Sequence, residues 1–140
     1  MNFSGSILLV DDEAHIRKFI SLLLRHLGTT RIFEAPNGME ALEVYKREQP
    51  DLVMLDVNMP VMDGIATLKA LKAINPDCVV VMLTSLANRQ TIDEAVALGA
   101  ANYIRKDAAP EDIGRALAET IEACFETEDA DDADAPPPGL

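Results

Sequence analysis

Acidic, hydroxyl and lysine side chains follow directly after short apolar runs of this sequence. They are Asp11 and Asp12 after residues 7–10, Asp56 at the end of 52–56, Thr84 after 79–83 and Lys106 after 102–105. If these runs are parallel strands of one sheet, all of these side chains reach the same edge, where such sheets bind their ligands. Each residue alone has a plainer explanation, such as helix capping by Asp12 or a solvated surface lysine at Lys106. Capping does not explain why three carboxylates, a hydroxyl group and a lysine converge on one edge.

The three carboxylates indicate a cation site. Carboxylates held close together repel one another, so they must either keep their protons or bind a cation. Mg²⁺, or Mn²⁺ with the same ligand preference, takes oxygen ligands, keeps several waters and leaves room for a phosphoryl oxygen. No Gly-rich loop follows residues 7–10, so the anion would be held by the metal, Lys106 and the Thr84 hydroxyl. The pattern therefore predicts a site for phosphate and metal and disfavours a nucleotide pocket.

Short runs of branched aliphatic residues alternate with segments of helical period, which is typical of a parallel α/β sheet. The predicted strands are 7–10, 31–35, 52–56, 79–83 and 102–105. The first predicted helix carries an apolar stripe of Ile16, Phe19, Ile20, Leu23 and Leu27 and ends at Gly28. The other predicted helices are 38–47, 64–73, 88–98 and 110 to about 125. Right-handed crossovers place the helices on both faces of the sheet.

Length and charge narrow the class of protein. The chain has 140 residues, 49% of them hydrophobic, which fits one compact domain. Its 12 Lys+Arg against 24 Asp+Glu give a net charge of −12, so neither nucleic acid nor an anionic membrane is an expected partner. With no signal segment and no long apolar run, the expected location is the cytoplasm. There the two cysteines, Cys78 and Cys124, are expected to be buried and unpaired.

The composition changes after Phe125. Residues 126–140 contain six acids, three consecutive prolines and no basic residue. Such a segment has too little apolar surface to fold, so it is predicted to be an acidic, Pro-rich disordered tail. The predicted domain therefore covers residues 1–125.

Four motifs together resemble the receiver domains of two-component response regulators, specifically the stand-alone, chemotaxis-regulator type. They are Asp11-Asp12, Leu55-Asp56-Val57-Asn58-Met59-Pro60 with Asp63-Gly64, Met82-Leu83-Thr84-Ser85, and Gly99-Ala100-Ala101-Asn102-Tyr103-Ile104-Arg105-Lys106. The resemblance covers residues 6 to about 125. It implies a flavodoxin-like, doubly wound (βα)5 fold with a five-stranded parallel sheet in the order 2-1-3-4-5.

The resemblance also implies a role for each site residue. Asp56 would accept a phosphoryl group from a histidine kinase or phosphotransfer protein, and Lys106 would neutralise that group. The implied metal ligands are Asp11, Asp12, Asp56 and the backbone carbonyl of Asn58. Thr84 and Tyr103 would form the switch, and the side chains of Asn58 and Leu86 would tune dephosphorylation.

As a receiver domain, the chain would be a signalling phosphoacceptor that phosphorylates and dephosphorylates itself and not a metabolic enzyme. Its output would be protein binding through the fourth helix, fifth strand and fifth helix, as a monomer or a phosphorylation-dependent dimer. The partner would be a flagellar switch, a relay protein or an enzyme. Two alternatives stay open: a Mg²⁺-dependent phosphohydrolase, disfavoured by Asn58 where a second acid is expected, and a binding module that works without phosphorylation.

One departure from the family pattern concerns the lysine. The family usually places a proline in a cis peptide after it, whereas Asp107 follows Lys106 here. A cis bond before a residue other than proline costs ~2.5–4 kcal/mol, so a trans bond is expected. The Asp107 carboxylate is also expected to compete for the charge of Lys106.

Overall fold

The sheet has five parallel strands in the order β2-β1-β3-β4-β5, which confirms the expected topology. The computed structural model describes residues 5–29, 31–59, 61–85 and 89–126. The strands are β1 (Ser6–Val10), β2 (Arg31–Ala35), β3 (Leu52–Asp56), β4 (Val79–Thr84) and β5 (Asn102–Arg105). β1, β3 and β4 are the inner strands, and their residues are almost all buried, as expected for strands covered on both faces.

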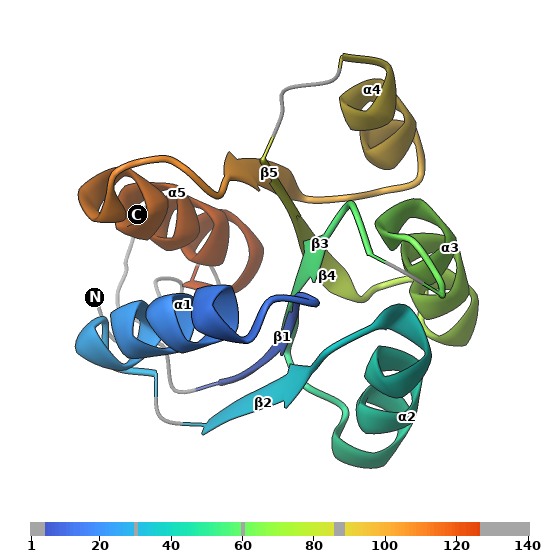
Figure 1. Ribbon diagram of the computed structural model, residues 1–140, viewed down its shortest axis with the longest axis horizontal. Coiled ribbons are helices and arrows are strands. Elements are labelled where there is room, and N and C mark those ends of the chain that lie inside the picture. Colours follow the sequence, from blue (N-terminus) through green and yellow to red (C-terminus); the bar gives the residue numbers. More distant parts are fainter. Residues whose placement is uncertain (1–4, 30, 60, 86–88, 127–140) are drawn as a thin grey trace, which may run out of the picture.

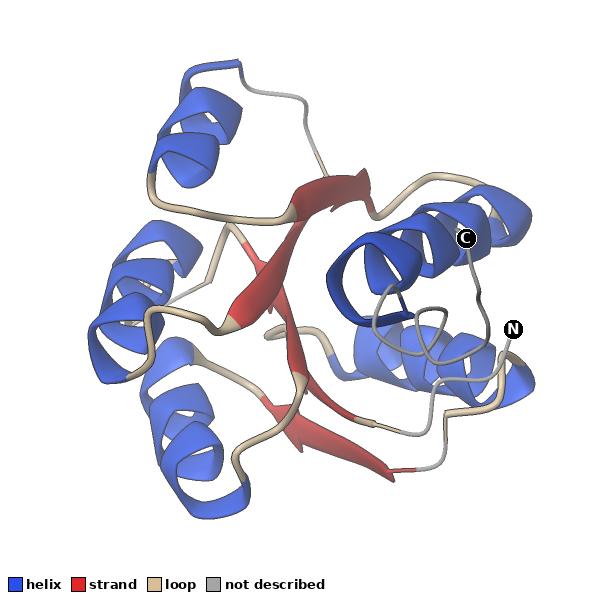
Figure 2. Ribbon diagram, turned by 180° about the vertical axis from the view of Figure 1, so that it is seen from behind, coloured by secondary structure: helices blue, strands red, loops and turns tan. Residues whose placement is uncertain are grey.

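Helices cover both faces of this sheet (Figure 1). They are α1 (Ala14–His26), α2 (Gly38–Glu48), α3 (Gly64–Ile74), α4 (Arg89–Ala97) and α5 (Pro110–Ile121), followed by a π-helical turn, Glu122–Glu126. α1 and α5 lie on one face, and α2, α3 and α4 lie on the other; Figure 2 shows the same layers from behind. The doubly wound (βα)5 architecture is thereby confirmed.

Alternate residues of the inner strands face two separate cores, because successive side chains of a strand point to opposite faces. Leu8 and Val53 pack in the core under α2 and α3. Ile7 and Leu52 pack in the core under α1 and α5. With their side chains buried on both faces, these strands carry polar side chains only at their first or last residues.

The starts of α2 and α3 are fixed by local hydrogen bonds. The Asn37 side chain accepts a hydrogen bond from the backbone N–H of Glu40 at the start of α2. Asp63 does the same for Ala66 at the start of α3. Such side-chain caps satisfy backbone donors that have no partner within the helix. These caps explain why both helices begin where the sequence predicts.

The stripe predicted for α1 is partly wrong. Ile20 and Leu24, one turn apart, are buried at its centre, whereas Phe19 is 39% exposed. Phe19 is rotated by about 100° from Ile20 around the helix, which places it at the margin of the buried stripe. The apolar face of α1 is therefore centred on Leu24, which the predicted stripe omits.

The two cysteines differ, contrary to the expectation that both are buried. Cys78 is buried at 5% exposure, while Cys124 in the π-helical turn is exposed. Both are free thiols. Among the described residues no helix has the length and apolar character needed to cross a bilayer. Of the predicted tail, only Glu126 lies within the described residues.

Candidate functional site

The carboxyl ends of the inner strands bring two carboxylates together. Asp11 directly follows β1 and Asp56 is the last residue of β3, and their side chains are 0% and 1% exposed. The backbone N–H of Glu13 donates to Asp11 Oδ1 at 2.9 Å, and that of Asn58 donates to Asp56 Oδ1 at 3.1 Å. These two turns hold one oxygen of each carboxylate and leave the other, Oδ2, directed into the site.

Lys106 joins the two carboxylates. Its Nζ atom lies 2.8 Å from Asp11 Oδ2 and 3.1 Å from Asp56 Oδ2, and 3.7 Å from Glu13 Oε1. The lysine side chain is only 10% exposed, so both short ion pairs are shielded from water. The backbone contributes to this placement, since Lys106 N–H donates to the carbonyl of Thr84 at 2.8 Å. The predicted convergence of Asp11, Asp56 and Lys106 is therefore present in the structure, while Thr84 contributes its backbone carbonyl.

Burial sets the electrostatics of Asp56. Desolvation and the neighbouring charge of Asp11 raise the pKa of Asp56 to about 6, although Lys106 and the Asn58 N–H oppose the rise. Burial lowers the pKa of Lys106, but the hydrogen bonds and charges of Asp11 and Asp56 outweigh it, and the net direction is upward. At neutral pH the site therefore holds a charged lysine between two carboxylates, one of which is ionised at an energetic cost.

The acidic cluster has the donor set of a hard cation. One carboxylate oxygen each from Asp11, Asp12 and Asp56 lies within 4.8 Å of the others. Apart from their ion pairs with Lys106, the buried Oδ2 atoms of Asp11 and Asp56 accept no hydrogen bond from the described residues. Asp12 is exposed, which leaves one side of the cluster open to water. Oxygen ligands with an open side suit Mg²⁺, which keeps part of its water shell.

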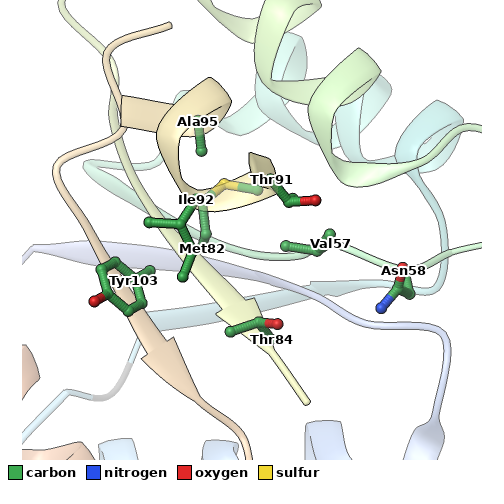
Figure 3. Close-up of a pocket in the computed structure, with 8 residues that line it drawn as sticks. All are labelled: Val57, Asn58, Met82, Thr84, Thr91, Ile92, Ala95 and Tyr103. Atoms are coloured by element: carbon green, nitrogen blue, oxygen red, sulfur yellow. The ribbon is translucent and has the colours of Figure 1, made fainter. Parts of the chain in front are cut away.

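Thr84 and Tyr103 lie on neighbouring strands beside a pocket of about 150 Å³. The pocket lies under α4, and Val57, Met82, Ile92 and Ala95 form its apolar wall. Thr84 is buried, whereas Tyr103 is 45% exposed. Figure 3 shows the phenol oxygen of Tyr103 pointing away from Thr84. The structure therefore places the two predicted switch residues beside one cavity, with the tyrosine in an outward orientation.

The comparisons with known proteins agree with this geometry. Residues 7–118 match the family model for the response regulator receiver domain. The chain belongs to this family. This receiver is 36% identical over 115 residues to a chemotaxis protein CheY of Bacillus subtilis, covering 82% of the chain and 96% of the relative. It is also 38% identical over 100 residues to sporulation initiation phosphotransferase F of the same organism, covering 71% and 80%.

Solved structures show the same fold. Vibrio cholerae CheY4 superimposes with a TM-score of 0.78 at 30% identity, covering 84% of this receiver and 99% of that chain. A CheX-CheY-BeF3-Mg complex from Borrelia burgdorferi contains a chain with a TM-score of 0.78 at 27% identity, covering 86% and 89%. The similarity to CheY-type proteins thus extends over nearly their full length.

Asp107 follows Lys106 where the family usually has a proline, and the structure shows a contact of Asp107 that the sequence did not indicate. Asp107 makes a two-pronged ion pair with Arg105, through contacts of 2.9 and 2.8 Å, and not with Lys106. The expectation that Asp107 competes for the charge of Lys106 is therefore wrong. No cis peptide bond occurs in the described parts of the receiver, in agreement with the expected trans bond. The lysine reaches the site from a trans loop.

Two other positions complete the comparison with the predicted site. Leu86, predicted to tune dephosphorylation, lies outside the described residues. Arg17 was not predicted: its guanidinium donates to the backbone carbonyl of Asp11 at 2.6 Å and pairs with Glu34 at 3.0 Å. An arginine six residues after an acid gives no sequence signal of its own, because the contact depends on how α1 starts.

Proposed function

We propose that this receiver is a Mg²⁺-dependent phosphoacceptor. Asp56 would take a phosphoryl group from the phosphohistidine of a histidine kinase or phosphotransfer protein, and the phosphorylated domain would signal by binding another protein. The observation that carries the proposal is the contact of Lys106 Nζ with both Asp11 and Asp56 at the carboxyl edge of the sheet. A lysine held on the acceptor carboxylate is positioned to neutralise the phosphoryl oxygens.

The chemistry is a transfer between two nucleophiles. A carboxylate oxygen of Asp56 forms a bond to phosphorus while the bond from phosphorus to the histidine nitrogen breaks, and the imidazole leaves with that electron pair. Phosphoryl transfer requires positioning and charge neutralisation more than covalent assistance from the protein. The turn at Asn58 fixes the orientation of the Asp56 carboxylate. Its pKa of about 6 leaves Asp56 ionised, and hence nucleophilic, at neutral pH.

The acidic cluster fits the metal that this chemistry needs. Asp11, Asp12, Asp56 and the backbone carbonyl of Asn58 would hold Mg²⁺ or Mn²⁺. The bound ion supplies positive charge to the phosphoryl oxygens and orients the donor. The similarity to a CheY chain solved with BeF3 and Mg²⁺ supports this assignment.

The pocket beside Thr84 links phosphorylation of Asp56 to a change in the shape of the protein surface. A phosphoryl group adds negative charge and acceptor oxygens at Asp56, so the Thr84 hydroxyl is drawn toward it. Tyr103 then turns inward, because a cavity of about 150 Å³ is large enough for one aromatic ring. The surface formed by α4, β5 and α5 changes shape as a result, and we assign the signalling contact to it.

Intact-mass measurement after incubation with acetyl phosphate and Mg²⁺ tests this function. The expected result is one phosphate adduct that requires Mg²⁺, is absent from Asp56→Asn and persists in Asp77→Asn, a matched change at an exposed aspartate. No adduct and no consumption of acetyl phosphate would favour a module that binds without phosphorylation. Sustained consumption with no adduct, even in rapidly quenched samples, would favour a phosphohydrolase.

Asn58 is proposed to tune the loss of the phosphoryl group. It is exposed and lies two residues after the acceptor, in the wall of the pocket (Figure 3). Its amide is polar enough to orient an attacking water. Asn58→Ala is therefore expected to change the rate of self-dephosphorylation, measured as decay of the phosphorylated mass, and an unchanged rate would contradict this role.

A further inference from the structure

The exposed surface of α4, β5 and α5, which we call the α4–β5–α5 face, has an apolar centre. β5 is the edge strand of the sheet, and α4 and α5 flank it (Figure 1). Tyr103 on β5 and Val96 on α4 are 45% and 58% exposed. Ile92, one helical turn before Val96, lines the adjoining pocket with Tyr103. A partner side chain that covers this centre would bury apolar surface that water now contacts.

The rim of this face is acidic. The exposed charged residues of segment 89–122 comprise three arginines and seven acids, a net charge of −4. They are Arg89, Arg105 and Arg115, with Asp93, Glu94, Asp107, Glu111, Asp112, Glu119 and Glu122. Without Glu94, which lines a groove toward α3, and Glu111 and Arg115, which line a groove toward α1, the net charge is −3.

Each arginine of the rim is already paired with an acid of the same rim. Arg89 lies 3.5 Å from Asp93. Arg105 and Arg115 lie 2.8 Å from Asp107 and Asp112. An incoming acidic group would therefore have to displace an existing partner, whereas a basic group finds acids such as Glu119 outside these pairs.

The surface of α1 and α2 has the opposite net charge. Residues 14–48, which include α1 and α2, carry six basic and four acidic side chains, a net charge of +2. A cationic partner is therefore steered toward the α4–β5–α5 face and away from the surface of α1 and α2.

We propose that the α4–β5–α5 face binds a basic, amphipathic segment of another protein. An aromatic or aliphatic side chain of that segment covers Val96 on α4 and the part of β5 that Tyr103 leaves when it turns inward, and flanking lysines or arginines pair with the acids of α4 and α5. Charge complementarity is the argument for a basic occupant, since an acidic one would meet a net negative charge. The inference rests on the proposed function, which assigns the signalling contact to this face.

Two synthetic peptides test the inference on the full chain, treated with acetyl phosphate and Mg²⁺. Both are about 14 residues long with the same spacing of leucines; one has lysine at every polar position and the other has glutamate. Titration calorimetry is expected to show binding of the lysine peptide at least about tenfold tighter than the glutamate peptide, and weakened by added NaCl.

A pair of double variants locates the binding. Asp93→Asn with Glu119→Gln neutralises one acid on each side of Tyr103 and is expected to weaken binding of the lysine peptide ~5-fold. Glu43→Gln with Glu48→Gln removes the same charge from exposed positions of α2. This double variant is expected to change the affinity for the lysine peptide less than about twofold. An equal loss of affinity for the lysine peptide in both double variants, or no loss in Asp93→Asn with Glu119→Gln, would refute the α4–β5–α5 face as the binding site.

The phosphate adduct on Asp56 is measured in the same samples by mass. If it forms but peptide binding does not depend on Asp93 and Glu119, the inference fails while the proposed function stands. If no adduct forms but binding of the lysine peptide still depends on these acids, the proposed function fails and the basic character of the ligand is supported.

Discussion

Replacing the acceptor Asp56 by asparagine is expected to stabilise the fold in the absence of metal. The ionised carboxylate is buried, and its pKa is raised from 3.8 to about 6. At 1.36 kcal/mol per pKa unit, its ionisation in the folded chain costs ~3 kcal/mol of stability at neutral pH. Asparagine removes that charge with little change in volume, and Lys106 keeps its 2.8 Å contact with Asp11. We therefore expect the free energy of unfolding of Asp56→Asn to exceed that of the wild type by ~2–3 kcal/mol.

The sign of the pH dependence follows from the same pKa. Because the pKa is higher in the folded chain, the folded state binds more protons than the unfolded state between pH 3.8 and about 6. The Asp56 contribution to wild-type stability therefore falls as pH rises through this window. The advantage of Asp56→Asn is complete above about pH 7 and lost below about pH 4.

Urea unfolding in EDTA, followed by circular dichroism, measures the difference at about pH 7.5 and about pH 4. Asp77→Asn is the matched control and should leave the stability nearly unchanged at both, since Asp77 is exposed. A variant no more stable than the wild type at the higher pH, or an advantage that persists at the lower pH, would refute the account of Asp56 as a buried charge.

Three further perturbations have defined outcomes. In Gly64→Ala the new Cβ would lie 2.3 Å from the backbone oxygen of Asp56, so we expect the free energy of unfolding in urea to fall by ~1–3 kcal/mol. Gly114→Ala is the control: the nearest atom to its new Cβ is 3.7 Å away, so this variant should not be destabilised. Val61→Gly should raise the unfolding free energy by ~1 kcal/mol, because Val61 is 81% exposed and has φ 70°, where a β-branched residue is strained; equal or lower stability would contradict this strain. Added Mg²⁺ should raise the melting temperature of the wild type in a concentration-dependent way, with a much smaller rise in Asp12→Asn; an equal rise in both would remove Asp12 from the metal site.

The fold and the convergence of the acids were predictable because the inner strands are buried on both faces. A run such as 52–56 admits apolar residues throughout, so a single aspartate at its end stands out. Parallel strands then bring such end residues to one edge whatever the details of packing. This is why Asp11 and Asp56 were placed correctly without knowledge of any contact.

The expectation for Asp107 was wrong because it rested only on the position of Asp107 next to Lys106 in the sequence. β5 ends at Arg105, so Lys106 and Asp107 lie in a turn, where the alternation of side chains in a strand does not apply. In this turn the backbone N–H of Ala108 donates to the carbonyl of Arg105, and the Asp107 carboxylate lies beside the Arg105 guanidinium. The pair depends on the geometry of the turn, which the sequence did not indicate.

The error at Cys124 has a different origin. Burial was expected from the usual behaviour of unpaired cysteines and not from the position of Cys124 on the helix. The four-residue spacing of Leu117 and Ile121 leads to Phe125, which does pack against the core. The same spacing gives no reason to expect Cys124 to be buried.

The contrast between the two thiols provides a spectroscopic reporter without any engineering of the fold. Burial raises the pKa of the Cys78 thiol and keeps it from reagents, so a maleimide dye should attach at the exposed Cys124 alone. That dye would lie in the π-helical turn just beyond the end of α5. Fluorescence anisotropy of the singly labelled chain could then follow partner binding in real time, with Cys124→Ser as the unlabelled control.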